Sequence, residues 1–205
     1  MRIYLVTDER LLFGKDLYRT VEAAVKGGVG MVQLREKESS TREFVERAIR
    51  LKEVLTPYGV PLIINDRVDV ALAADADGVH VGQSDMPYEM VKRLLPEGKI
   101  IGLSVESPEQ VLEANDYDLD YVAASPVFST ATKTNTIVEW GLDGLRWIKS
   151  VSRHPLVAIG GIHSNNVASI FKAGADSVAV ISAIVSADDP ERAARELLEK
   201  SGEPH

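Results

Sequence analysis

The chain alternates between short apolar runs and longer segments with helical spacing. Eight apolar runs recur along it, namely IYLV (3–6), MVQL (31–34), PLII (61–64), GVHV (78–81), IIGLS (100–104), YVAA (121–124), LVAI (156–159) and SVAVI (177–181). They lack the clean alternation of polar and apolar residues that marks a sheet with one solvated face. The runs are therefore typical of strands that are buried on both faces of a parallel sheet.

The segments between these runs predict helices. Four apolar residues after the second run fall on one helix face: Phe44, Ala48, Leu51 and Leu55. Ser40 and Glu43 form a capping box at the start of this helix. Ser107 and Asp189 each precede a proline, as residues at helix N-termini often do. Strands and helices are thus expected to alternate along the chain.

Eight strands with intervening helices predict an α/β protein, a single (β/α)₈ or TIM barrel that forms one domain over residues 1–205. The tail at 201–205 is expected to be frayed. An open doubly wound sheet is the alternative fold. It normally carries a glycine-rich fingerprint after the first strand, where this chain has TDERLLFGK. In a barrel, all loops that follow strands lie at one face, so polar residues after different runs are expected to share one pocket.

Composition and charge narrow the range of functions. With 205 residues, of which 45% are hydrophobic and 26% charged, the chain is typical of a soluble globular protein. The net charge of -8 argues against nucleic acid and anionic membranes as partners, so an anionic substrate needs a local basic cluster or a metal ion. The absence of cysteine excludes thiolate nucleophiles and is compatible with the cytoplasm, where we expect the protein to act.

The first group of polar residues follows the second run and consists of Gln33, Arg35 and Lys37. Alternation along the strand puts these three side chains on one side of the backbone. Two cations and an amide that point into a barrel mouth suit a diphosphate. The alternative is an exposed loop with ordinary solvated charges.

A second group contains two carboxylates, Asp66 and Asp85, which follow neighbouring runs. Carboxylates from adjacent strand ends can share one Mg²⁺ ion, which prefers one or two of them together with phosphate oxygens and water. The alternative is that each aspartate caps the helix that begins just after it. The basic cluster nearby favours metal binding over capping.

Two further groups suit phosphate. The polar stretch 129–134, with sequence STATKT, follows the sixth run and fits contact with a phosphate, or else a flexible loop. Gly160-Gly161 and Ile181-Ser182 follow the last two runs, where many barrels bind a monophosphate. The role of His80 is left open between packing and an indirect effect on the site. Two anion sites without an evident nucleophile or general base favour the displacement of pyrophosphate by a second phosphorylated substrate.

Seven motifs in a fixed order resemble the thiamine-phosphate synthase family over nearly the whole chain: QLREK (33–37), ND (65–66), ADGVHVGQSD (76–85), GLS (102–104), PVFSTATK (126–133), AIGGI (158–162) and AVISAI (179–184). This resemblance implies a transferase with two small phosphorylated substrates. One is the diphosphate of hydroxymethyl-aminomethyl-pyrimidine, and the other is the phosphate of hydroxyethyl-methyl-thiazole or its carboxylated form. A homo-oligomer is left open.

The resemblance also implies roles for individual residues. The pyrimidine diphosphate is expected to contact Gln33, Leu34, Arg35, Glu36, Lys37, Asn65, Ser104 and Lys133. The thiazole phosphate is expected to contact Thr130, Ala131, Thr132, Gly161, Ile181 and Ser182. The residues expected to be catalytic are Arg35, Lys37, Ser104 and Lys133, and Mg²⁺ is expected to bind to Asp66 and Asp85. Pyrophosphate would leave first, and the thiazole nitrogen would then capture the resulting methylene cation.

Some positions depart from the family pattern. Ser125 stands where the family usually has glycine, Glu106 lies where a histidine is often found, and Asn135 replaces a common acidic residue. These departures bear on rate or substrate preference more than on reaction class. One alternative function is a thiazole tautomerase of the same fold, which has a histidine at the position held here by Pro126. Another is a catalytically silent phosphate-binding barrel.

Overall fold

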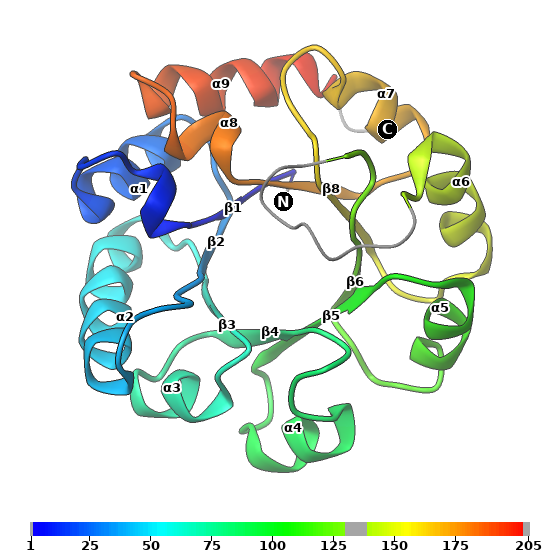
Figure 1. Cartoon of the computed structure of the whole chain (residues 1–205), viewed down its shortest axis with the longest axis horizontal. Helices are drawn as coiled ribbons and strands as arrows, with labels where there is room; N and C mark the ends of the chain where they lie inside the picture. The colour runs from blue at the N-terminus through cyan, green and yellow to red at the C-terminus, as the bar shows by residue number, and fades with distance from the viewer. Residues whose placement is uncertain (1, 130–138, 203–205) are drawn as a thin grey trace.

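Eight parallel strands close into a barrel in the order of the sequence (Figure 1). The computed structural model describes residues 2–129 and 139–202. The strands are β1 (Ile3–Val6), β2 (Met31–Leu34), β3 (Leu62–Asn65), β4 (Gly78–Val81), β5 (Ile100–Val105), β6 (Tyr121–Ala124), β7 (Leu156–Ile159) and β8 (Ser177–Val180). The barrel closes where Ile3 of β1 pairs with Val178 of β8. The expected TIM barrel is therefore confirmed over the open sheet.

Helices form an outer ring around the strands, as Figure 1 shows. They are α1 (Leu17–Lys26), α2 (Thr41–Leu55), α3 (Val68–Ala73), α4 (Tyr88–Leu94), α5 (Pro108–Ala114), α6 (Gly141–Val151), α7 (Val167–Lys172), α8 (Ser182–Val185) and α9 (Pro190–Lys200), with short 3₁₀ helices at Glu9–Leu11 and Thr56–Tyr58. The expected capping box of Ser40 and Glu43 is present at the start of α2. Ser107 and Asp189 cap α5 and α9 by accepting backbone hydrogen bonds.

The period of two along each strand divides the core into two parts. One set of side chains fills the barrel interior: Tyr4, Val6, Met31, Ile63, Tyr121, Ala123, Val157 and Ala179. The side chains on the other face, such as Leu5 and Leu34, pack between the sheet and the helices. Inward-pointing polar residues near the carboxyl ends of the strands therefore lie directly above the interior core.

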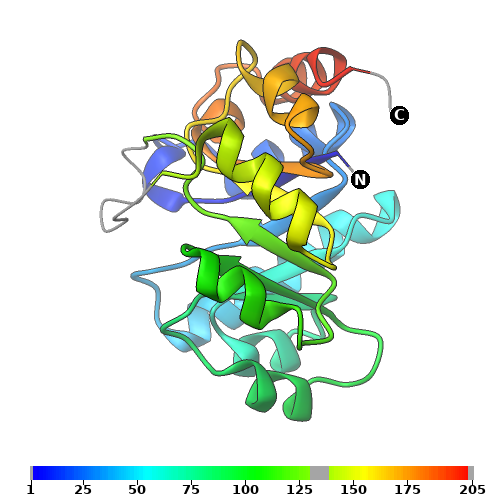
Figure 2. The ribbon, with the colours of Figure 1, turned by 90° about the vertical axis from the view of Figure 1, so that its right-hand side faces the viewer.

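The side view in Figure 2 places the N-terminus and the end of α9 at the face where the strands begin. Ser201, expected to be frayed, is instead buried, and its hydroxyl accepts a hydrogen bond from Arg2 Nε at 2.9 Å. The sequence pattern missed this because the partner lies at the other end of the chain. Residues 203–205 of the same tail lie outside the described ranges. Within those ranges, no helix is both long and apolar enough to cross a membrane.

Candidate active site

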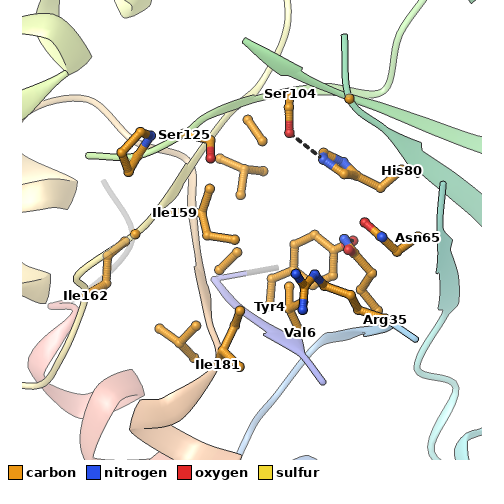
Figure 3. Close-up of a pocket in the computed structure, with 18 of the residues that line it drawn as sticks. Tyr4, Val6, Arg35, Asn65, His80, Ser104, Ser125, Ile159, Ile162 and Ile181 are labelled. Atoms are coloured by element: carbon orange, nitrogen blue, oxygen red, sulfur yellow. Dashed lines mark hydrogen bonds between the residues drawn. The ribbon is translucent and has the colours of Figure 1, made fainter. Parts of the chain in front are cut away.

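A cavity of about 840 Å³ opens at the face where the strands end. All eight strands contribute lining residues, from Tyr4 on β1 to Ala179 on β8. In Figure 3, Arg35, Asn65 and His80 approach the cavity from one side, and Ile162 and Ile181 approach it from the other. The volume lies within the usual range for small-molecule sites.

The basic side of the cavity is built from alternate residues after β2. Gln33, Arg35 and Lys37 all line the cavity, as their spacing predicts. Arg35 is held by Asp8, whose Oδ2 accepts a hydrogen bond from Arg35 Nη1 at 2.8 Å. Arg10, which no sequence motif predicted as a site residue, also lines the cavity, and its Nη2 lies 2.9 Å from the same oxygen.

Asp8 is an ionised anchor for these two arginines. Burial favours the neutral acid, but the hydrogen bonds from Arg10 and the charge of Arg35 outweigh it and hold the pKa of Asp8 below its ordinary value. The side chain of Asp8 is only 4% exposed, so water screens these contacts little. Asp8 therefore fixes Arg35 in position without itself facing the cavity centre.

The residues between these basic positions point elsewhere. Leu34 is fully buried in the core between sheet and helices. The Glu36 carboxylate accepts hydrogen bonds from Ser39 Oγ at 2.6 Å and Arg47 Nη1 at 2.7 Å, and it lines a separate pocket beside α1. Burial raises the pKa of Glu36. The expected contact of Leu34 and Glu36 with a substrate stays a prediction, and in this arrangement it would be made by their main-chain atoms.

Asp66 and Asp85 are brought together at the mouth of the barrel. Asp66 lies next to Lys37, with 2.6 Å between Asp66 Oδ2 and Lys37 Nζ. Asp85 Oδ2 accepts a hydrogen bond from the Gly82 N–H at 2.7 Å. The capping alternative does not apply, because the N-cap residues of α3 and α4 are Arg67 and Pro87 and neither helix has a side-chain cap hydrogen bond.

The neighbouring Asp66 carboxylate disfavours the charged form of Asp85. Burial raises the pKa of Asp85; the Gly82 N–H opposes the shift, and contact with Asp66 adds to it. A divalent cation would relieve this repulsion. No group of three or more acidic or histidine ligands exists among the described residues. A pair of carboxylates nonetheless fits Mg²⁺, which completes its shell with phosphate oxygens and water.

Gly160 and Gly161 form a tight turn after β7. Their φ angles of 106° and 66° lie in the left-handed region that favours glycine. A Cβ atom on Gly161 would approach Phe128 Cβ to 2.8 Å. Ser182 begins α8 beside this turn, and both segments line the cavity. The first N–H groups of a helix have no intrahelical acceptor, so this corner offers backbone donors to an anion.

Other polar residues lie deeper in the cavity. Asn65 and Ser104 line it as expected, and His80 points into it as well (Figure 3). His80 Nε2 lies 2.8 Å from Ser104 Oγ, and Nδ1 lies 3.0 Å from the Tyr121 hydroxyl. In the sequence, Tyr121 stands out only as part of an apolar run. A hydroxyl at an inward-pointing strand position was the available signal.

Four expected site residues, Thr130, Ala131, Thr132 and Lys133, lie outside the described parts of the chain, as does the departure at Asn135. The other two departures, Ser125 and Glu106, both line the cavity. Both residues therefore border the same space as the expected substrate contacts.

Comparison with known proteins identifies relatives along nearly the whole chain. A family model described as thiamine monophosphate synthase matches residues 3–184. The thiamine-phosphate synthase of Albidiferax ferrireducens is 52% identical over 190 residues, which cover 93% of this chain and 87% of that protein. The protein of the same name from Vibrio campbellii is 50% identical over 197 residues, or 96% of each chain.

Solved structures agree with the sequence relatives. A thiamine phosphate pyrophosphorylase from Pyrococcus furiosus has a TM-score of 0.89 and 42% identity, and the match covers 97% of this chain and 94% of that one. A 3-hexulose-6-phosphate synthase from Salmonella typhimurium has a TM-score of 0.73 at 22% identity and covers 98% of both chains. That second likeness shows a shared fold alone.

Proposed function

The chain belongs to the thiamine monophosphate synthase family, and from this membership we propose the reaction that its cavity carries out. The family makes it a transferase of the pyrophosphorylase type. We propose that it joins 4-amino-2-methyl-5-(diphosphooxymethyl)pyrimidine to 4-methyl-5-(2-phosphoethyl)thiazole, or to the 2-carboxy form of that thiazole. The products are thiamine phosphate and pyrophosphate, and the 2-carboxy form would also release its carboxyl group as carbon dioxide.

One observation carries the proposal: two opposite sides of the cavity carry different groups that suit anions. Arg35, Lys37 and the aspartate pair lie after β2, β3 and β4, whereas the Gly160-Gly161 turn and Ser182 lie after β7 and β8. A diphosphate fits the first side because cations and a metal can neutralise it. A monophosphate fits the second side because backbone N–H groups suffice for it.

On the diphosphate side, Arg35 and Lys37 hold the leaving pyrophosphate. Gln33, Asn65 and Ser104 lie deeper and are placed to contact the pyrimidine ring. Lys133, which the family resemblance assigns to the same substrate, would add a third cation. Asp66 and Asp85 would hold Mg²⁺, which when bound neutralises charge on the diphosphate.

On the monophosphate side, Gly161, Ile181 and Ser182 hold the thiazole phosphate. The resemblance adds Thr130, Ala131 and Thr132 to this subsite. Anchoring the phosphate here directs the thiazole ring towards the pyrimidine across the same cavity. Holding two reactants in one site in this way removes much of the entropic barrier to their reaction.

The bond changes require no protein nucleophile. The C–O bond between the pyrimidine methylene and the diphosphate breaks, and its electron pair leaves with pyrophosphate. The amino group of the ring stabilises the methylene cation that remains. The thiazole nitrogen then donates its lone pair to that carbon. The residues of the chain orient the two rings and stabilise the departing charge.

A discontinuous assay with purified protein tests this proposal. It supplies the pyrimidine diphosphate, the thiazole phosphate and Mg²⁺, and it measures thiamine phosphate. We expect product only when all three components are present. Folded protein that makes no product under these conditions would contradict the proposal and favour the tautomerase or the silent barrel. A cytoplasmic location stays a prediction, and the oligomeric state is left open.

A further inference from the structure

Five buried polar side chains form a continuous chain of hydrogen bonds across the floor of the cavity. Gln33 Nε2 donates to the Tyr4 hydroxyl at 2.7 Å, and the Tyr4 and Tyr121 hydroxyls are 2.9 Å apart. Tyr121 then contacts His80 Nδ1, and His80 Nε2 contacts Ser104 Oγ. Each of these residues is at most 9% exposed. These hydrogen bonds link Gln33 and Ser104, the two members of the series that are proposed to contact the pyrimidine.

Tyr121 lies in the middle of this series of hydrogen bonds but does not line the cavity. Its ring crosses the neighbouring strand at Gly102, where an added Cβ atom would come within 2.1 Å of the ring. The missing side chain lets Tyr121 lie nearly parallel to the His80 ring, at an angle of 11°. Gly102, the glycine of the GLS motif, therefore leaves the space that the Tyr121 ring needs for its hydroxyl to reach His80.

The direction of the hydrogen bonds follows from counting protons. Because Gln33 donates its amide N–H, the Tyr4 oxygen is an acceptor at that contact. If Tyr4 donates to Tyr121, and Tyr121 donates to His80 Nδ1, each hydroxyl both accepts and donates once. His80 then carries its proton on Nε2 and donates to Ser104 Oγ. The Ser104 proton is left to point at a ligand in the cavity.

The opposite direction leaves a buried donor unmatched. A proton on His80 Nδ1 would donate to Tyr121, and Tyr121 would donate to Tyr4. Tyr4 would then accept twice, and its own proton would have no acceptor among its hydrogen-bond partners. An unmatched buried hydroxyl is unfavourable, and Tyr4 is only 1% exposed. The same penalty applies to a His80 ring that is protonated on both nitrogens.

We propose that Tyr121 is a positioning residue that holds His80 in the Nε2–H tautomer and so presents Ser104 as a hydrogen-bond donor to the substrate. The identity of that substrate rests on the proposed function. A pyrimidine ring nitrogen is an acceptor and matches a donating hydroxyl. If the hydrogen bonds ran in the opposite direction, Ser104 Oγ would present lone pairs to the same nitrogen and would repel it. Tyr121 thus acts on the substrate through two intervening side chains.

Nitrogen NMR of protein labelled with ¹⁵N-histidine tests the tautomer without any substrate. We expect His80 Nδ1 to resonate as an unprotonated nitrogen and Nε2 as a protonated one. The His80→Gln variant assigns the signals by removing them. In Tyr121→Phe the preference for the Nε2–H form should disappear, whereas Tyr4→Phe should keep it because Tyr121 can still donate. A dominant Nδ1–H signal in the wild type would overturn the proposal.

Kinetics test the consequence for the substrate. Tyr121→Phe should raise the KM for the pyrimidine diphosphate or lower kcat by about tenfold, the effect of one hydrogen bond, with the KM for the thiazole phosphate unchanged. Tyr117→Phe is the matched control, because its hydroxyl donates to Glu113 and the residue does not line the cavity. An equal change in both KM values, or no change in either parameter, would contradict a positioning role.

A double variant keeps the test independent of folding defects. Glutamine at position 80 can donate to Ser104 without help from Tyr121, so Tyr121→Phe should have little further effect in the His80→Gln background. A full, additive loss there would overturn the coupling. Wild-type protein with the Nε2–H tautomer but no turnover would contradict the proposed function alone, while supporting the direction of the hydrogen bonds.

Discussion

Lys37 and Asp66 form an ion pair across the mouth of the barrel, with 2.6 Å between Nζ and Oδ2. Asp85 stands beside Asp66, and its pKa is raised, first by burial and further by that neighbouring carboxylate. Lys37 therefore occupies an oxygen of Asp66 that the proposed metal would use. With Mg²⁺ held by the two aspartates as proposed, Lys37 would instead contact a phosphate group of the proposed substrate. The pair thus keeps the charge of the site balanced before substrate binds.

This arrangement predicts how turnover depends on the metal ion. Chelating divalent cations should abolish thiamine phosphate formation, and Mg²⁺ should restore it. Asp66→Asn and Asp85→Asn should each raise the Mg²⁺ concentration needed for half-maximal turnover by an order of magnitude or more, because one of two ligands is lost. Asp116→Asn, at an exposed position after α5, is the control. Full activity in the presence of chelator would rule out the metal role of the two aspartates.

Arg35 should contribute mainly to the chemical step. It faces the cavity and is held rigidly by Asp8, so its charge is in place before the leaving group develops its own. Arg35→Ala should lower kcat by roughly 10²–10³-fold, as the loss of one preorganised donor does in other enzymes. The protein should still fold, with a modestly lower unfolding temperature, because buried Asp8 then keeps Arg10 but loses Arg35 as a partner. Arg19→Ala, on the exposed side of α1, provides the comparison, and equal kinetics for the two variants would remove Arg35 from the mechanism.

The strands could be predicted within one residue because their buried apolar runs are local in sequence. The small shifts have local causes: β3 begins at Leu62 because Pro61 has no N–H, and β8 ends at Val180 because the chain turns into α8 at Ile181. Strand alternation likewise placed Arg35 and Lys37 in the cavity. The same alternation turns Leu34 and Glu36 away from the cavity. Assigning every residue of the QLREK motif to the substrate hides this difference.

The floor of the cavity could not be predicted in this way. Tyr4 and Tyr121 are 117 positions apart, and their contact depends on how far the strands are staggered around the barrel. Nothing in either strand alone encodes that stagger. The orientation of Arg35 similarly depends on Asp8, a residue of another strand end. The pattern of apolar and polar residues within one strand cannot predict such polar contacts between residues that are far apart in the sequence.

Asp8 should make the stability of the protein sensitive to acid. Its pKa lies below the ordinary value of 3.8 because Arg10 and Arg35 outweigh the effect of burial. The group therefore stabilises the fold fully above that ordinary value, and this contribution is lost as the pH falls through the lowered pKa. Asp8→Asn should unfold at lower urea concentration at neutral pH, and its difference from wild type should shrink under acid. A difference that stays constant with pH would contradict this account.

The Gly160-Gly161 turn predicts a variant that separates binding from folding. Alanine at position 161 meets two obstacles: a left-handed backbone with φ of 66°, and Phe128 Cβ at 2.8 Å. The backbone strain alone costs roughly 1–2 kcal/mol, and the contact must also shift the turn that is proposed to bind the thiazole phosphate. Gly161→Ala should therefore raise the KM for the thiazole phosphate while leaving the KM for the pyrimidine diphosphate nearly unchanged.

Gly59 offers a matched control for this variant. Its φ of 64° is almost the same, but nothing lies within 4 Å of an added Cβ atom, and the residue is not part of the cavity lining. Gly59→Ala should lower the urea midpoint only by the cost of placing alanine in a left-handed backbone conformation, and it should keep both KM values at the wild-type level. If the two variants instead change the thiazole KM equally, the effect comes from general destabilisation. A selective rise in Gly161→Ala would locate the second phosphate at this turn, because both substitutions strain the backbone in the same way, whereas Gly161 lines the cavity and Gly59 does not.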